Sequence, residues 1–160
     1  KAADFFVRNF PGDVLYAVKA NPHPAIIDAV WAGGVRSFDV ASLPEIELVA
    51  GRFPEARLAF MHPVKSRLAI RRAYFDYGVR IFVLDSLDEL DKIIRETNGA
   101  KDLHLVVRLS VSSDYAQHKL NGKFGVSGPE AVQLLRQARA SAEELGVSFH
   151  VGSQCMRPEA

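Results

Sequence analysis

Ionisable side chains recur at the ends of short apolar runs along this sequence. In chain order they are Lys19, Asp39, His62, Asp85, Arg108 and His150, with Ser153 following the last of them. Catalytic side chains of a parallel α/β barrel project from the C-terminal ends of its strands, so these residues are the candidate site residues.

Lys19 is the candidate with the most definite chemistry. It follows the run Leu15-Tyr16-Ala17-Val18, and an ammonium at the end of a strand buried on both sides is expected to be desolvated. Desolvation favours the neutral amine, which is a nucleophile suited to forming a Schiff base with an aldehyde.

Six apolar runs are expected to form the strands that position these side chains. They are Val14 to Ala20, Ser37 to Ala41, Leu58 to Met61, Arg80 to Leu84, His104 to Leu109 and Val147 to Val151. Most are apolar on both faces instead of alternating with polar residues, which is typical of a parallel sheet covered by helices.

Helical patterns lie between these runs. Three of them begin with a capping box, in which a serine and a glutamate three residues later satisfy free backbone groups: Ser42 to Glu45, Ser86 to Glu89 and Ser127 to Glu130. From Ala131 the apolar residues keep helical spacing as far as Leu145, so we expect a helix that ends at Gly146. The polar segment from Asp114 to Gly125 is expected to be a functional or interface loop.

A strand followed by a helix, repeated about every 20 residues, indicates a parallel α/β architecture. Such a fold is either an open doubly wound sheet or a (β/α)8 barrel. The glycine-rich dinucleotide fingerprint is absent after the first strand, where the chain reads Lys19-Ala20-Asn21-Pro22. The barrel is therefore favoured, and because eight strands and about 250 residues are typical, six strands predict an incomplete barrel.

Composition excludes several classes of protein. The 160 residues are 48% hydrophobic and 24% charged, with 20 basic and 19 acidic residues, which is typical of a globular domain. The charge is balanced and no basic face is evident, so nucleic-acid binding is not expected. No apolar stretch approaches 18 residues, so no membrane segment is expected. With one cysteine and histidines lacking metal-ligand spacing, no metal site is expected.

Four motifs resemble, in order and spacing, those of the fold-type III pyridoxal-phosphate (PLP) decarboxylases. They are Tyr16-Ala17-Val18-Lys19-Ala20-Asn21, Phe38-Asp39-Val40-Ala41-Ser42 with Glu45, Lys123-Phe124-Gly125, and Ser148-Phe149-His150-Val151-Gly152-Ser153-Gln154. Within this family the chain is most similar to the ornithine decarboxylases, including bacterial enzymes that also take lysine. The resemblance implies a (β/α)8 TIM barrel of the alanine racemase-like type, PLP as cofactor, and decarboxylation of L-ornithine to putrescine in polyamine biosynthesis.

The resemblance also implies a role for each matching residue. Lys19 would hold PLP covalently, His150 would stack on the pyridine ring, and both would take part in catalysis. Ser153 would donate a hydrogen bond to the cofactor phosphate. Arg108 would lie near the phenolic oxygen of PLP, and Asp39 would line the same pocket.

Three alternatives remain open at this point. Diaminopimelate decarboxylase shares Lys19-Ala20-Asn21-Pro22 and Gly152-Ser153-Gln154 but is usually richer in glycine and serine after the second strand. Alanine racemase shares the lysine motif but not the His150 motif. A non-catalytic regulatory homologue of the antizyme-inhibitor type would keep the fold, although it would not need Lys19, Arg108, His150 and Ser153 together.

The sequence also predicts which part of a longer protein this chain represents, and the oligomeric state and location of that protein. Residues 1–160 are expected to be the N-terminal part of the PLP-binding barrel, with the remaining strands and a C-terminal β-domain absent from this chain. The family's phosphate loop and proton-donor cysteine belong to those parts, so the 160-residue chain alone is not expected to turn over. A homodimer in the cytoplasm, acting on a small amino acid substrate, is expected for the full-length protein.

Overall fold

The computed structural model describes residues 1–111, 116–118 and 123–157, and for residues 116–118 and 153–155 it describes the backbone alone. The elements follow in the order α1 (Ala2–Asn9), β1 (Leu15–Ala17), the 3-10 turn η1 (Val18–Ala20), α2 (Pro24–Ala32), β2 (Ser37–Val40), α3 (Leu43–Arg52), β3 (Arg57–Phe60), α4 (Arg67–Phe75), β4 (Ile81–Leu84), α5 (Leu87–Glu96), β5 (Leu103–Arg108), β6 (Ala116–His118), α6 (Gly128–Arg139), β7 (Ala142–Ser148) and β8 (Ser153–Cys155). None of these helices has the length and hydropathy needed to cross a membrane.

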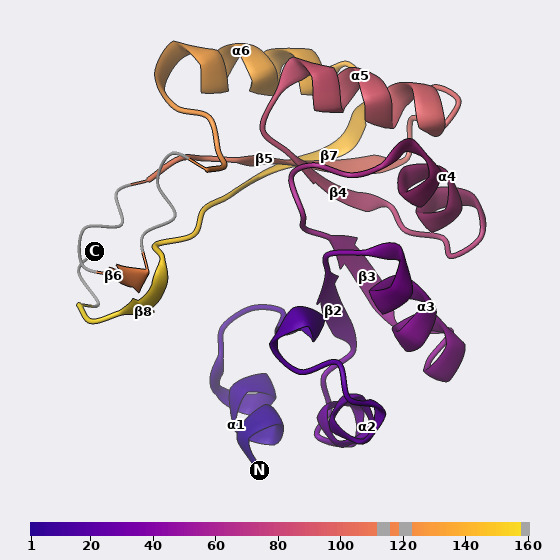
Figure 1. Cartoon of the computed structure of the whole chain (residues 1–160), viewed down its shortest axis with the longest axis vertical. Helices are drawn as coiled ribbons and strands as arrows, with labels where there is room; N and C mark the ends of the chain where they lie inside the picture. The colour runs from indigo at the N-terminus through magenta and orange to yellow at the C-terminus, as the bar shows by residue number, and fades with distance from the viewer. Residues whose placement is uncertain (112–115, 119–122, 158–160) are drawn as a thin grey trace.

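Six strands form one sheet in the order β1-β2-β3-β4-β5-β7, and every neighbouring pair in it is parallel. Strands β6 and β8 form a separate antiparallel pair. Figure 1 shows the large sheet curving, with α3, α4, α5 and α6 along its outer side. The predicted alternation of parallel strands and helices is therefore confirmed, and the described residues supply six of the eight strands that close a barrel.

The core lies between the sheet and these helices. In β5 the side chains of Leu103, Leu105 and Val107 are buried, whereas the alternate residues His104 and Arg108 are partly exposed. Because successive side chains of a strand point to opposite faces, the second set lies on the inner face of the curved sheet. Arg108 is thereby placed on the concave side, at the C-terminal end of its strand.

The helix starts predicted from capping boxes occur, but the boxes themselves form only in part. The Ser86 hydroxyl accepts a hydrogen bond from the Glu89 amide at 3.3 Å, as predicted for α5. Ser42 and Ser127 make no such side-chain bond, and Glu45 instead accepts from the Ala41 amide at 2.8 Å. The capping prediction is thus confirmed for the serine of one box and wrong for those of the other two.

The prediction of a helix from Ala131 to Leu145 is wrong for the second half of this range. Helix α6 ends at Arg139, and Ala142 already begins β7. Ala142 and Leu145 lie opposite Leu103 and Leu105 of β5, so pairing with that strand overrides the helical spacing of the apolar residues. The predicted strand from Val147 to Val151 consequently ends at Ser148, and His150 lies beyond it.

Candidate active site

The predicted site residues gather at the C-terminal edge of the sheet. Lys19 lies in η1, directly after β1, and Asp39 is the third residue of β2. Arg108 is the last residue of β5, and His150 follows the end of β7 by two residues. These four residues, here called the candidate site, act on one another electrostatically.

Lys19 and Asp39 face each other across neighbouring strands. The register pairs Ala17 with Asp39, and Lys19 Nζ lies 4.0 Å from Asp39 Oδ2. The Lys19 side chain is 58% exposed, so the predicted desolvation of its ammonium is wrong for this structure. The physical reason is that the chain leaves the sheet at Ala17, which puts Lys19 on a turn instead of inside a strand.

Asp39 is more enclosed than Lys19, with 23% of its side chain exposed. Burial raises the pKa of its carboxyl, although the positive charges of Lys19, Arg108 and His150 act in the opposite direction. Desolvation therefore outweighs attraction by the cations, and the carboxyl holds its proton more tightly than a free aspartate does.

His150 is oriented by the backbone that follows it. The Gly152 amide donates a hydrogen bond to His150 Nδ1 at 2.9 Å, so in the neutral ring the proton is on Nε2. Partial desolvation lowers the pKa of His150, and the charges of Arg108 and Lys19 lower it further, against the effect of Asp39. The planar imidazole ring can stack on an aromatic cofactor.

Arg108 contacts the predicted Lys123-Phe124-Gly125 motif. Its guanidinium carbon lies 5.4 Å from the centroid of the Phe124 ring. Gly125 has φ +95°, and a Cβ there would lie 2.7 Å from the Ser110 nitrogen, so this position requires glycine. The Gly125 amide also donates to Asp85 Oδ2 at 2.9 Å, which ties the motif to the end of β4.

Ser153, the predicted phosphate ligand, begins β8, and its side chain lies outside the described residues. Of the predicted loop from Asp114 to Gly125, residues 114–115 and 119–122 lie outside the described residues. The Ser153 prediction therefore stays a prediction, as does the role of this loop.

The structure brings one further pair to this edge. His62 follows β3 by two residues, and its ring lies edge-on to Phe124, with 5.5 Å between the centroids and 74° between the planes. The sequence places His62 at a strand end, but it gives no sign that Phe124, 62 residues later, is its neighbour. Only this end-of-strand position could have suggested that the residue belongs near the site.

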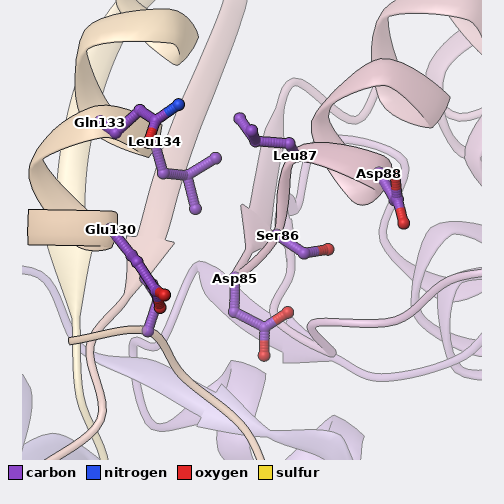
Figure 2. A pocket seen from close by; sticks show the side chains of 8 residues that line it. Asp85, Ser86, Leu87, Asp88, Glu130, Gln133 and Leu134 are labelled. Carbon is purple, nitrogen blue, oxygen red and sulfur yellow. The ribbon is translucent and has the colours of Figure 1, made fainter.

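A cavity of about 390 Å³ lies beside this edge, between the first turns of α5 and α6. Figure 2 shows its lining, which includes the acidic residues Asp85, Asp88 and Glu130. Three carboxylates disfavour a phosphate-bearing ligand, and none of the four candidate-site residues lines the cavity. Among the described residues, no group of three or more His, Cys, Asp or Glu side chains is arranged to hold a metal ion.

The candidate site has three chemical groups that fit PLP. Lys19 supplies a primary amine for the aldehyde, and its exposed side chain is accessible to it. Arg108 supplies a permanent cation for an anionic oxygen, and His150 supplies a planar ring. The residues present therefore fit this cofactor.

Comparison with known proteins gives a consistent result. The family model described as pyridoxal-dependent decarboxylase, pyridoxal binding domain, matches residues 2–160. The lysine/ornithine decarboxylase of Selenomonas ruminantium is 37% identical over 159 residues, which is 98% of this chain and 39% of that protein. The ornithine decarboxylase of Mus pahari is 38% identical over 146 residues, covering 90% of this chain and 31% of the relative.

Solved structures are similar over almost the whole chain. A SrLDC mutant in complex with PLP superposes with a TM-score of 0.85 at 36% identity, covering 98% of this chain and 40% of that one. The arginine decarboxylase of Paramecium bursaria Chlorella virus gives a TM-score of 0.86 at 33% identity, covering 98% of this chain and 42% of that one. These matches confirm the predicted fold, an incomplete barrel of the alanine racemase-like type, and the predicted cofactor class.

The chain spans about two fifths or less of the lengths of these relatives, which means that it corresponds to one part of them. The chain carries Lys19 and the candidate site described above. With the family model matching all but the first residue, the chain belongs to the pyridoxal-dependent decarboxylases and corresponds to their pyridoxal-binding domain.

Proposed function

We propose that the full-length protein carrying this chain is a PLP-dependent decarboxylase of basic amino acids that converts L-ornithine to putrescine, with L-lysine as a second substrate. The observation that carries this proposal is the meeting of Lys19, Asp39, Arg108 and His150 at one sheet edge in a pyridoxal-binding domain. The names of the relatives, ornithine and lysine/ornithine decarboxylases, support the substrate class.

When bound, PLP supplies an electron sink that stabilises the charge left on the substrate after carbon dioxide departs. Lys19 would supply the amine that holds the cofactor. Asp39 Oδ2 lies 4.0 Å from Lys19 Nζ, so this carboxylate would orient the Lys19 side chain toward the site.

His150 and Arg108 act as binding groups in this proposal. The Gly152 amide fixes the plane of the His150 imidazole, so the ring can lie against the cofactor and keep it in one orientation. The guanidinium of Arg108 is a cation and favours an anionic oxygen beside it. Ser153 is proposed as a phosphate ligand.

The remaining groups needed for turnover are assigned to other parts of the full-length protein. We propose that residues 1–160 are the N-terminal part of the barrel domain, followed by its last strands and a C-terminal β-domain. In this proposal the full-length protein is a cytoplasmic homodimer, since the family builds part of each site from the second subunit.

The test is a side-by-side assay of carbon dioxide release by the full-length protein. L-ornithine should be the best substrate, L-lysine a second one, and meso-diaminopimelate and L-arginine poor ones. Preference for meso-diaminopimelate would indicate lysine biosynthesis, and racemisation of alanine without carbon dioxide release would indicate a racemase. Full cofactor occupancy without turnover would favour the regulatory homologue.

Attachment is tested separately by reduction with borohydride and peptide mapping. The pyridoxyl group should be found on Lys19, and Lys19→Ala should abolish the label. Lys101→Ala is the matched control, because Lys101 precedes β5 and so lies toward the opposite edge of the sheet. A label that survives in Lys19→Ala would show that the assignment is wrong.

A further inference from the structure

Three side chains from distant parts of the chain form a row of contacts at the C-terminal edge of the sheet. The His62 ring packs edge-on against Phe124 at 5.5 Å, and the Arg108 guanidinium lies 5.4 Å from the same Phe124 ring. Arg108 in turn acts on Asp39 and His150. The row therefore connects His62, which lies outside the candidate site, to the charges within it.

We propose that His62 and Phe124 are positioning residues that hold the guanidinium of Arg108 in the orientation required at the PLP site. This inference rests on the proposed function in one respect, because the orientation matters to PLP only if Arg108 faces it. An arginine side chain has several rotatable bonds, and a cation near an aromatic ring is attracted by the electrons of that ring. Phe124 thus limits the positions that the guanidinium adopts.

Phe124 itself is held by the backbone around it. The Val126 amide donates to the Arg108 carbonyl at 3.0 Å, and the Ser110 amide donates to the Val126 carbonyl at 2.9 Å. Gly125 packs so closely on Leu109 and Ser110 that no side chain fits there. The segment that carries Phe124 is therefore fixed directly beside the strand end that carries Arg108.

His62 is held just as firmly from the other side. The Val64 amide donates to His62 Nδ1 at 3.2 Å, which fixes the ring plane. Lys65 Nζ donates to the His62 carbonyl at 3.0 Å, and the Lys65 side chain is fully buried and paired with Glu89 at 3.0 Å. A shift of His62 would thus disturb a buried ion pair, so this ring forms a rigid support for Phe124.

The experiment uses the full-length protein without PLP, with labelled histidines, and measures the pKa of His150 by NMR. Arg108 is one of the charges that lower this pKa, so a guanidinium that is no longer held should let it rise. We expect the pKa of His150 to rise in Phe124→Leu, which keeps apolar bulk but removes the ring. Phe124→Tyr keeps the ring and should restore the original value.

The matched control is Phe75→Leu, since Phe75 is an exposed phenylalanine at the end of α4, and it should leave the pKa of His150 unchanged. A second measurement is the dissociation constant of PLP. It should increase about two- to thirtyfold in Phe124→Leu, which is the range expected for the loss of one cation–ring contact.

His62→Asn provides an independent test if Phe124→Leu does not fold. Asparagine keeps a side-chain acceptor for the Val64 amide but removes the ring that supports Phe124. An unchanged pKa of His150 in this variant, or in a folded Phe124→Leu, would overturn the inference. A raised pKa of His150 in a protein that never binds PLP would support the positioning role and count against the proposed function. Failure of the positioning inference is thereby distinguishable from failure of the proposed function.

Discussion

Replacing Lys65 with methionine should strongly weaken the sheet edge that carries the candidate site. Lys65 Nζ donates to the Val83 carbonyl at 2.6 Å and to the His62 carbonyl at 3.0 Å, and it pairs with Glu89. The side chains of Lys65 and Glu89 are 0% and 4% exposed. Methionine fills a similar volume, so the effect reports the lost charge and hydrogen bonds and not a cavity.

The magnitude follows from what remains after the substitution. Glu89 keeps Lys92 at 2.6 Å but loses its buried partner, and the Val83 carbonyl loses the Lys65 ammonium as a donor. Removing one member of a buried ion pair typically costs about 3 to 5 kcal/mol. At about 1.4 kcal/mol per factor of ten, the local opening equilibrium should rise by roughly two to three and a half orders of magnitude.

Amide hydrogen exchange of the full-length protein, read on peptides from α4 and α5, measures this opening directly. Lys101→Met, at an exposed lysine, is the control and should leave exchange in these peptides unchanged. The double variant Lys65→Met, Glu89→Leu should recover most of the loss, because it leaves no unpaired buried charge. A loss below about 1 kcal/mol in the single variant, or no recovery in the double variant, would refute the reasoning.

Three further predictions concern pH, backbone conformation and turnover. Burial lowers the pKa of Lys65 to about 8 from 10.5. Between these two pH values the unfolded chain therefore binds more protons than the folded chain does. The local free energy of opening, compared with that of Lys65→Met, should rise by up to about 3 kcal/mol as the pH increases through this range. Hydrogen exchange corrected for intrinsic rates measures this difference. Gly125→Ala should destabilise the Phe124 segment by about 1 to 3 kcal/mol, because Gly125 has φ +95° and the new Cβ would meet the Ser110 nitrogen. Thermal unfolding measures this loss, and Gly51→Ala is the control because a Cβ there meets nothing within 4 Å. His150→Ala should lower the turnover number more than the PLP affinity, and a loss confined to affinity would contradict the proposed orienting role of the ring.

Much of this chain could be predicted from the sequence because the relevant signals are local. Apolar runs separated by helical patterns predict parallel strands and helices, and all six expected strands occur in one parallel sheet. The residue types at the strand ends, Lys19, Asp39, Arg108 and His150, predict a shared site because parallel strands end at the same edge. These predictions require only the spacing of apolar residues within each segment and the position of each motif relative to the end of its strand.

What the tertiary structure alone decided depends on contacts between segments far apart in the chain. Ala142 and Leu145 fit a helix by spacing, yet pairing with β5 places them in a strand, because a strand neighbour satisfies their backbone groups across the sheet. Lys19 is exposed because its chain leaves the sheet one turn earlier than its apolar neighbours suggest. The contact of His62 with Phe124 is fixed by a buried ion pair on one side and by Gly125 on the other, and no local pattern encodes either distance.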